Sequence, residues 1–311
     1  MDHTEIRVAG VTCKVPSIQV GRTAVIVTGK WLKLAAIHDE EWLEGDVLPN
    51  PNLCIAGVRA ARDLGADIFT FSQKTNDATP RFAFHHEWDS IAAIPIVSYA
   101  DWWTNRVSTH LRQDVKRAAK RGVIVRSVPF TDDLVRQILD IYNETPIRQG
   151  RAFWHYGKGF DAIKMENATY VERSEFLGAY VGDELIGFMK IVYVDRVARV
   201  MQILPKEAHY DKRAMNALIA KAVELCEAKG CSHLVYGNYR YSQGADSLTA
   251  FKRKNGFEEV LVPRYYVPLT RKGALCLNLH LQRGLRQLVP ASILKSFKRV
   301  RAAIYRHLKA A

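Results

Sequence analysis

Apolar and polar residues in the second half of the chain repeat first with a helical and then with a strand period. Residues 131–145 carry one apolar stripe behind Thr131, a residue type that caps helix N-termini. Three apolar β-type segments follow, at residues 175–181, 185–194 and 196–204. Gly-Asp and Asp residues between them tolerate the positive φ angles of tight hairpin turns. We therefore predict a helix followed by a three-stranded antiparallel meander.

A long helix follows the meander directly and ends at Gly230. Its apolar positions lie on one helical face. They are Met215, Leu218, Ile219, Ala222, Val223 and Cys226. A buried-type strand at residues 232–237, a helix at 247–256 and a final strand at 257–269 complete the region. The predicted order is helix, three antiparallel strands, helix, strand, helix, strand.

In the first hundred residues, short β-type runs alternate with polar breaks. The runs occupy residues 7–15, 23–29, 67–73 and 91–99. A helix lies between Pro51 and Gly65, and another at residues 101–122 has Asp101 as its N-cap and Gly122 as its stop. We predict an α/β (α+β) chain of four parts. These are an N-terminal α/β lobe at 1–100, a connecting helix at 101–122, a second lobe at 123–270 and a basic helical tail at 271–311.

The net charge of +13 is concentrated at the C-terminal end. From residue 260 onward there is no Asp or Glu but there are eleven Lys and Arg residues, which leaves 34 cations and 32 acids for the rest of the chain. After Pro290, an apolar stripe from Ile293 to Leu308 runs along a basic helix. Three interpretations stay open for this tail: it binds an anionic membrane surface, contacts RNA such as tRNA, or docks on the body.

None of the five cysteines pairs in a C-x2-C motif, so we predict buried thiols rather than disulfides or a zinc site. They are Cys13, Cys54, Cys226, Cys231 and Cys276. No stretch reaches the roughly 20 uncharged apolar residues of a membrane span, and the first residues lack a signal-peptide pattern. We expect a cytoplasmic protein whose tail is the part that would meet a membrane surface.

The predicted element order resembles the acetyltransferase superfamily called GNAT over roughly residues 131–269. The G-D-E hairpin at 182–184, the helix directly after the third strand and the F-K-R-K-N-G-F turn at 251–257 carry this resemblance. With the upstream lobe and the basic helix at 112–123, the chain looks most like the FemAB-like branch, in which two such lobes sit side by side. The resemblance implies acyl transfer to an amine from a donor such as acetyl-CoA, while FemAB-like proteins use aminoacyl-tRNA.

Two departures from the GNAT pattern concern the donor. The family's Arg/Gln-x-x-Gly-x-Gly/Ala signature holds the coenzyme A pyrophosphate at a helix N-terminus. Here Tyr210, Arg213 and Met215 occupy its key positions, and no glycine occurs from residue 188 to residue 229. Phe251 stands where the family often carries a tyrosine that protonates the leaving thiolate. Tyr239 and Tyr241, on the preceding loop, are the remaining candidates for that acid.

The resemblance places the donor at residues 206–213 and along the third strand of the meander. The implied donor contacts are Gln202, Leu204, Lys206, His209, Tyr210, Lys212 and Arg213. Cations in a first helical turn are unfavourable beside the positive end of the helix dipole, so a nearby negative group is expected to offset them. An anionic ligand would be one such group, and a neighbouring acid such as Asp211 would be another.

The densest polar cluster lies at residues 143–158, which the resemblance places over the acceptor groove. In a functional interpretation, Glu144 or His155 is the general base. The cluster's cations would then bind an anionic acceptor or donor; they are Arg148, Arg151 and Lys158. In the alternative, the carboxylate pairs locally, the aromatic residues anchor the loop and the arginines are solvated.

Two further clusters have simpler interpretations. His85 and His86 are adjacent on a predicted strand, so their side chains point to opposite faces and cannot both reach an ion beside Glu87 without a bulge. We therefore predict a polar strand edge and no metal. Trp102 and Trp103 are interpreted as packing anchors rather than as a stacking platform.

We therefore predict an N-acyltransferase of GNAT type that uses an acyl-CoA-like thioester, with Tyr241 as a candidate acid. The first rival is an aminoacyl-tRNA-dependent, FemAB-like transferase, which would account for both the missing glycines and the basic tail. The second rival is a non-catalytic RNA- or membrane-binding module that kept the fold, which Phe251 permits.

Overall fold

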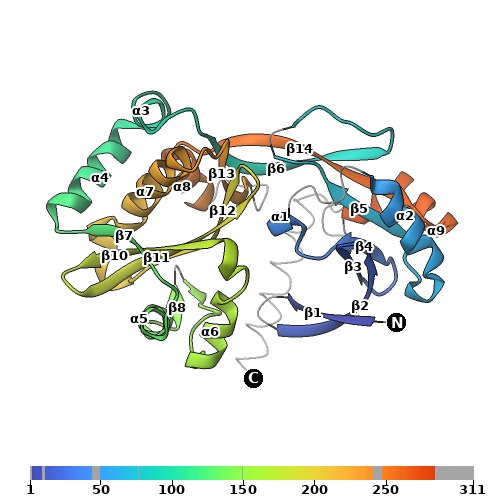
Figure 1. Cartoon of the computed structure of the whole chain (residues 1–311), viewed down its shortest axis with the longest axis horizontal. Coiled ribbons are helices and arrows are strands. Elements are labelled where there is room, and N and C mark those ends of the chain that lie inside the picture. Colours follow the sequence, from blue (N-terminus) through green and yellow to red (C-terminus); the bar gives the residue numbers. More distant parts are fainter. Residues whose placement is uncertain are drawn as a thin grey trace, which may run out of the picture.

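The computed structural model describes residues 2–8, 11–43, 50–75, 77–148, 150–240 and 247–283. Twelve strands of these residues form one sheet (Figure 1). From the first half come β1 (Asp2–Val8), β2 (Val11–Val20), β3 (Thr23–Thr28), β4 (Leu34–Ile37), β5 (Ile68–Ser72) and β6 (His85–Pro95). From the second half come β7 (Ile124–Val128), β10 (Ser174–Val181), β11 (Glu184–Val194), β12 (Val197–Pro205), β13 (His233–Asn238) and β14 (Glu258–Pro268).

The strand order is β1-β2-β3-β4-β5-β14-β6-β13-β12-β11-β10-β7. The two halves lie side by side in Figure 1, and β14 and β6 cross between them. Because β14 pairs antiparallel with both β5 and β6, the chain's last strand lies at the seam of the two lobes. A small separate hairpin pairs β8 (Ile147–Arg148) with β9 (Arg151–Ala152).

Helices cover both faces of the second lobe's sheet. They include α4 (Thr109–Lys120), α5 (Asp132–Tyr142), α6 (Phe160–Asn167), α7 (Ala214–Ala228) and α8 (Ser247–Lys254). One apolar core joins α4 and α7 to one face of β10–β13, and another joins α5 and α6 to the opposite face. This arrangement follows from the strand period of two, which sends successive apolar side chains of β10 into different cores.

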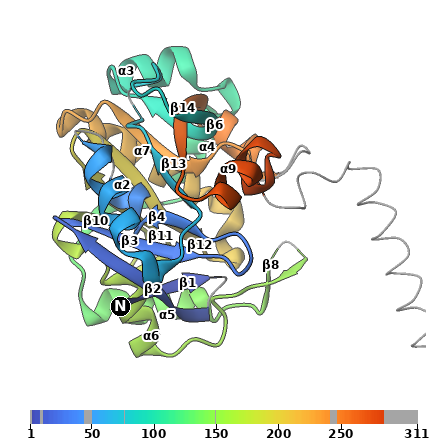
Figure 2. The same ribbon diagram turned by 90° about the vertical axis from the view of Figure 1, so that its right-hand side faces the viewer.

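In the first lobe, α2 (Pro51–Ala60) packs on β2 and β3 and shares a core with β5 and β14. Short helical segments connect the strands: α1 (Glu40–Leu43), η1 (Arg62–Leu64), α3 (Tyr99–Asp101), η3 (Val171–Arg173), η4 (Glu207–Lys212) and η5 (Leu281–Arg283). The last α-helix of the described residues, α9 (Arg271–Asn278), packs beside β14 (Figure 2). No helix within the described residues has the length and apolar character to cross a membrane.

The predicted order of the second lobe is confirmed, from α5 through the meander β10-β11-β12 to α7, β13, α8 and β14. Thr131 caps α5, because its hydroxyl accepts a hydrogen bond from the Leu134 amide. The turn residues Gly182 and Asp195 adopt positive φ angles of 58° and 50°. Local periodicity and turn chemistry predicted these elements, whereas β7, the β8–β9 hairpin and α6 of the same lobe were not predicted.

Two predictions were wrong, and a third is not tested. The predicted helix at 101–122 is broken: a π-helical turn, η2 (Trp102–Arg106), leads to α4, which Ser108 caps. The Asp101 carboxylate instead accepts hydrogen bonds from Asn105 and Arg106. Cys13 is exposed, although the other four cysteines are buried as predicted. The tail helices predicted around Pro290 lie outside the described residues.

Candidate functional site

A cavity of about 310 Å³ lies beyond the stretch over which β12 and β13 pair. These two strands pair in parallel from Val197 to Arg199 on β12, with His233 to Val235 on β13, and then diverge. The cavity lies at the end of β12, between the first turn of α7 and one face of α8. The chain thus positions two helices around a cavity at the end of a strand, and concave sites between structural elements commonly bind ligands.

The first turn of α7 lines this cavity, and no side chain caps it. Arg213 is the N-cap residue, and it has a φ of 60°. The next three residues, Ala214, Met215 and Asn216, line the cavity. A helix of 15 residues carries partial positive charge at this end, and its first amides lack intrahelical acceptors. The helix start is therefore suited to an anionic group.

The structure corrects the predicted extent of this helix. Residues 207–212 form the 3-10 helix η4, so the cations of that segment precede α7 instead of lying in its first turn. Lys206, just before η4, and His209 within it pair with the same acid, Glu184. The Lys206 Nζ lies 2.7 Å and the His209 Nε2 lies 3.2 Å from its carboxylate oxygens. The hydrogen bond from Lys206 and the charge of His209 lower the pKa of Glu184.

Arg213 and Asp211 also form ion pairs, each with a different partner. The Arg213 Nε lies 3.3 Å from Asp114 Oδ1 on α4, and Asp211 binds Arg121 at 2.6 Å. Acids of this chain thus account for most cations at 206–213, whereas Lys212 is half-buried. His209, Tyr210 and Arg213 line the cavity, and the side chain of Tyr210 is largely exposed.

Glu144 binds the start of η4. Its Oε2 accepts a hydrogen bond from the Glu207 amide at 2.6 Å, and its Oε1 accepts one from the Ala208 amide at 2.9 Å. The Arg148 guanidinium lies 3.3 Å from the same carboxylate. Because donors engage both oxygens, the carboxylate occupies an amide pair that would otherwise be open to an anion. These contacts favour local pairing over the general-base interpretation of Glu144.

Arg148 is held inside the protein. Its guanidinium donates to the Pro205 carbonyl at 2.8 Å and to the Ile141 carbonyl at 2.7 Å, and it lies over the Phe153 ring. Burial lowers the pKa of this guanidinium, and the charge of Glu144 partly offsets that effect. Arg148 therefore joins the end of α5 to the end of β12 and is not exposed toward an acceptor.

His155 lies beneath the loop in an aromatic environment and is 6% exposed. Its Nε2 lies 3.2 Å from the Gln202 Nε2, which also donates to the Tyr142 hydroxyl. Burial lowers the pKa of His155 to about 3, and the charges of Lys158 and Arg148 add to that effect. The imidazole is therefore neutral at physiological pH and a weak base.

The remaining predicted residues divide into paired, apolar and undescribed positions. The Lys158 Nζ lies 2.6 Å from Glu166 and over the Trp154 ring. Leu204 packs against the core of α5 and α6. Arg151 lies in β9, but nothing is described of its side chain. Tyr241 lies outside the described residues. The structure thus brings three of the predicted donor contacts, His209, Tyr210 and Arg213, to the cavity, while Glu144, Arg148 and Lys158 of the 143–158 cluster bond to other groups of this chain.

Sequence reasoning missed several residues of the cavity wall. On α8, Ala250 and Lys254 line it together with Phe251, at the helical spacing that places them on one face. Asp114 arrives from α4, which no local pattern indicated. Trp102 is fully buried, as predicted for an anchor, and its Nε1 donates to the Asn255 carbonyl at 3.1 Å. It thereby fixes the end of α8 that forms the wall.

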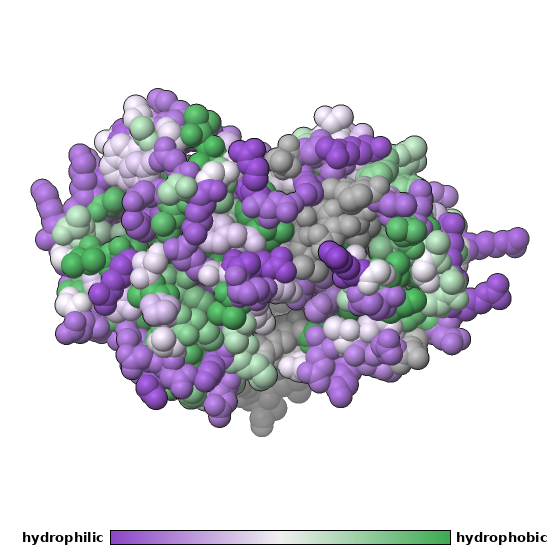
Figure 3. All heavy atoms as spheres, viewed as in Figure 1, coloured by the Kyte–Doolittle hydropathy of each residue, from purple (hydrophilic) through white to green (hydrophobic). Residues whose placement is uncertain are grey.

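A smaller cavity of about 90 Å³ lies between the lobes and was not predicted. Arg264 of β14 lies there, 3.0 Å from Glu40 and 2.5 Å from Asp89. Burial lowers the pKa of Arg264, but the two carboxylates outweigh burial and raise it. Hydrophilic side chains gather along this seam on the face shown in Figure 3. The three groups come from distant segments that only the strand order brings together.

No protein-family model matches the sequence, and no curated protein matches it either. Solved structures do match its fold. The C-terminal domain of a lysylphosphatidylglycerol synthetase from Agrobacterium fabrum aligns with a TM-score of 0.54 at 14% identity, over 86% of this chain and 88% of that one. FemX aligns with a TM-score of 0.54 at 10% identity, over 80% and 87%. The chain therefore shares the fold of FemX and of this synthetase domain, and the predicted mixed, mostly antiparallel sheet flanked by helices is confirmed.

A third match has the same extent. L-PGS from Bacillus licheniformis aligns with a TM-score of 0.53 at 14% identity, over 79% of this chain and 81% of that one. All three alignments span most of both chains, so the shared architecture includes both lobes and the strand crossing between them.

Proposed function

We propose that the protein is an acyltransferase that moves an acyl group from a phosphate-bearing donor to an amine in the cytoplasm. The uncapped start of α7, facing a cavity at the end of β12, is the observation that carries this proposal. The architecture supports it, because the chain shares its fold with FemX and with synthetases named for lysylphosphatidylglycerol, an aminoacylated lipid. At this level of identity the fold raises the expectation, and the site must supply the chemistry.

An acyl-CoA is the donor that we propose first. Its phosphates would bind the amides of Ala214 and Met215 beside Arg213, with Lys254 as a second cation at the rim. Ala250 and Phe251 offer an apolar wall for the arm that carries the acyl group. When bound, the thioester supplies the activated carbonyl. Because helix amides and side-chain cations would hold the phosphates, the missing glycines do not exclude such a donor.

An aminoacyl-tRNA is a second candidate, and the fold matches favour it. They extend over both lobes, and two of them carry the name of an aminoacylated lipid. A tRNA would place its terminal phosphates in the same cavity, and the basic residues of 271–311 would contact its body. In this version the tail is part of the donor site; with acyl-CoA, the tail is free to bind an anionic membrane.

Acyl transfer requires a neutral amine that attacks the acyl carbon and then loses one proton, while the leaving group gains one. We assign Glu144 and His155 to positioning, since the first is bonded through both oxygens and the second is neutral and buried. Phe251 cannot donate a proton to the leaving group. We propose Tyr241 as the acid, because its segment leads into α8, and Arg151 as the acceptor contact of its cluster.

Filling the cavity tests the proposal directly. Ala250→Trp places an indole where the donor would lie, and Ala119→Trp on the exposed side of α4 is the matched control. Acetyl-CoA and bulk aminoacyl-tRNA are added separately, and unfolding is followed by thermal shift. A donor present at 100 times its Kd stabilises the native chain by about 2.7 kcal/mol. We expect the control to keep this shift and the cavity variant to lose it.

The two donors give different outcomes in the same experiment. Suppose that acetyl-CoA raises the unfolding temperature and that Lys254→Glu lowers the affinity for acetyl-CoA about tenfold. This result supports the coenzyme A version, because the change removes one phosphate contact. A shift with tRNA alone, lost when residues 284–311 are removed, supports the aminoacyl version. If neither acetyl-CoA at millimolar concentration nor aminoacyl-tRNA at saturating concentration raises the unfolding temperature, the proposed site is wrong.

A further inference from the structure

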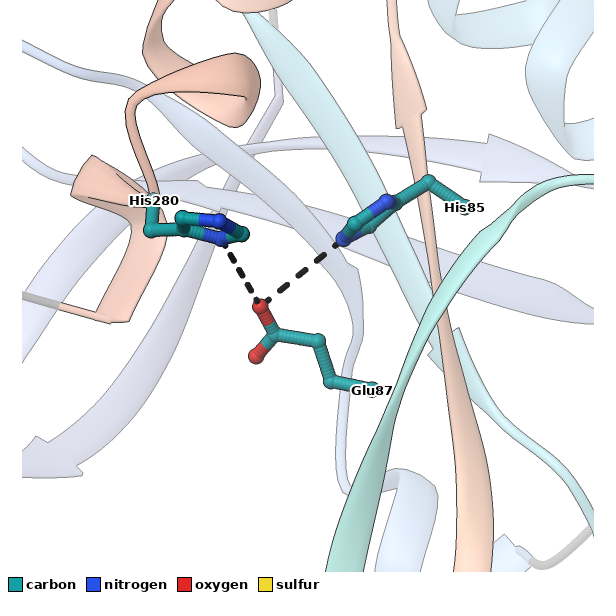
Figure 4. Close-up of side chains that lie close together, drawn as sticks. All are labelled: His85, Glu87 and His280. Carbon is teal, nitrogen blue, oxygen red and sulfur yellow. Dashed lines mark ion pairs between the residues drawn. The ribbon is translucent and has the colours of Figure 1, made fainter.

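Three potential metal ligands converge where the segment after α9 meets β6 (Figure 4). The His85 Nε2 lies 3.8 Å and the His280 Nδ1 lies 3.9 Å from the Glu87 Oε1. The three ligand atoms all lie within 4.8 Å of one another. In Figure 4 both imidazole rings point toward the Glu87 carboxylate.

The fold explains this convergence. His85 and Glu87 are two residues apart on β6, so they share one face of the sheet, whereas His86 packs against Trp88 and Tyr265. After β14 the chain reverses through α9, which the Thr270 hydroxyl caps. The histidine partner is therefore His280, which lies 193 residues beyond Glu87 and not beside it in the sequence.

Local geometry holds the ligands in place. His280 adopts a φ of 55°, in the left-handed region, directly after the end of α9. The Gln282 Nε2 donates to the Glu87 Oε1 at 2.7 Å, which orients the carboxylate from the same segment. Such an outer partner is typical of carboxylates that bind metals.

We propose that His85, Glu87 and His280 bind one divalent transition-metal ion, with Zn²⁺ as the preferred ion, and that this ion anchors the η5 segment to β6. Two imidazole nitrogens and one carboxylate oxygen are ligands that Zn²⁺ accepts in four-coordinate sites. Bonds of about 2.0–2.1 Å in a tetrahedron separate ligand atoms by about 3.3 Å. The two pairs that involve Glu87 therefore need to close by roughly 0.5–0.6 Å, and the two imidazole nitrogens by at most about 1.5 Å.

The exposure of the cluster also fits an ion. The side chains of His85 and His280 are 39% and 50% exposed, which leaves a path for entry, while that of Glu87 is 15% exposed. In a plain ion pair, each ring would need a proton to attract Glu87. In a metal site, each ring offers a lone pair instead, and the carboxylate joins both rings through the ion. The two arrangements therefore differ in whether Zn²⁺ binds.

The test measures metal content in the full chain. After treatment with chelator, the protein is equilibrated with Zn²⁺ alone, and bound metal is measured by elemental analysis; Co²⁺ reports the ligand geometry by its visible absorption. We expect about one Zn²⁺ per chain. His85→Ala, Glu87→Gln and His280→Gly each lower the affinity by more than about tenfold, with glycine chosen because it tolerates the positive φ. His86→Ala is the matched control and keeps the ion.

Hydrogen exchange supplies a second readout that does not depend on activity. Zn²⁺ should slow exchange in residues 271–283 and in β6 of the native chain, and His280→Gly should abolish this effect. The proposal is overturned if the native chain binds no Zn²⁺, if the three variants bind it as the native chain does, or if His86→Ala weakens binding equally. None of these readouts depends on the donor site, so their failure leaves the proposed acyl transfer unaffected.

Discussion

Two polar regions meet at the end of β12, and they differ in what their polar atoms contact. In the 143–158 cluster, Glu144, Arg148 and Lys158 are each bonded to other groups of this chain. By contrast, α7 begins after Arg213, no side chain caps this start, and its first residues line a cavity. The 143–158 cluster has the higher density of charged residues, yet these three side chains are engaged within the protein.

This difference shows that a dense group of charged residues is a weaker indication of a ligand site than an uncapped helix start beside a cavity. A high density of charged residues is compatible with a closed structural network, because other groups of the same chain can satisfy the acids and bases of one loop. Backbone amides carry no sequence signature, yet an uncapped helix start offers both hydrogen-bond donors and a favourable dipole. We therefore expect changes in the 143–158 cluster to alter stability, and changes around the cavity to alter donor binding.

The largest effect is expected from Glu144→Ala. The change frees two amides of η4 and leaves the Arg148 charge, on a side chain only 11% exposed, without its carboxylate. The free energy of unfolding should fall by about 3 kcal/mol, measured by urea denaturation. If Glu144 were the general base, Glu144→Gln would instead lower kcat about a hundredfold or more with little loss of stability. That result would reverse the comparison.

The next effect concerns pH and His155. Its pKa is about 3 in the folded chain and about 6.5 when unfolded, so the unfolded chain takes up a proton first as the pH falls. This group's contribution to stability is therefore lost progressively below pH 6.5, and the loss reaches about 2.7 kcal/mol at pH 4.5. His155→Gln should remove this part of the pH dependence. His110→Gln on the exposed side of α4 should retain it, and equal slopes in all three proteins would contradict the buried neutral state.

The sequence predicted what local patterns determine. The helical stripe behind Thr131, the turns at Gly182 and Asp195 and the stop at Gly230 fixed the element order of the second lobe. Contacts between distant segments were not predictable in this way. Glu144 binds amides 63 and 64 residues away, and His280 reaches Glu87 only because α9 reverses the chain after β14. The sequence places His85 and His86 on one strand but does not indicate that His280 lies beside Glu87.

The smallest effect is expected from Asp211→Asn. Asp211 pairs with Arg121 at 2.6 Å, but the side chains are 63% and 42% exposed, so water screens the pair. We expect the free energy of unfolding to change by less than about 0.5 kcal/mol. Donor affinity should stay within about twofold if the amides of α7, rather than the cations of η4, form the anion site. Binding that tightens tenfold would instead show that Asp211 competes with the donor for Arg121. Arg121, at the end of α4, would then hold the donor together with the amides of α7.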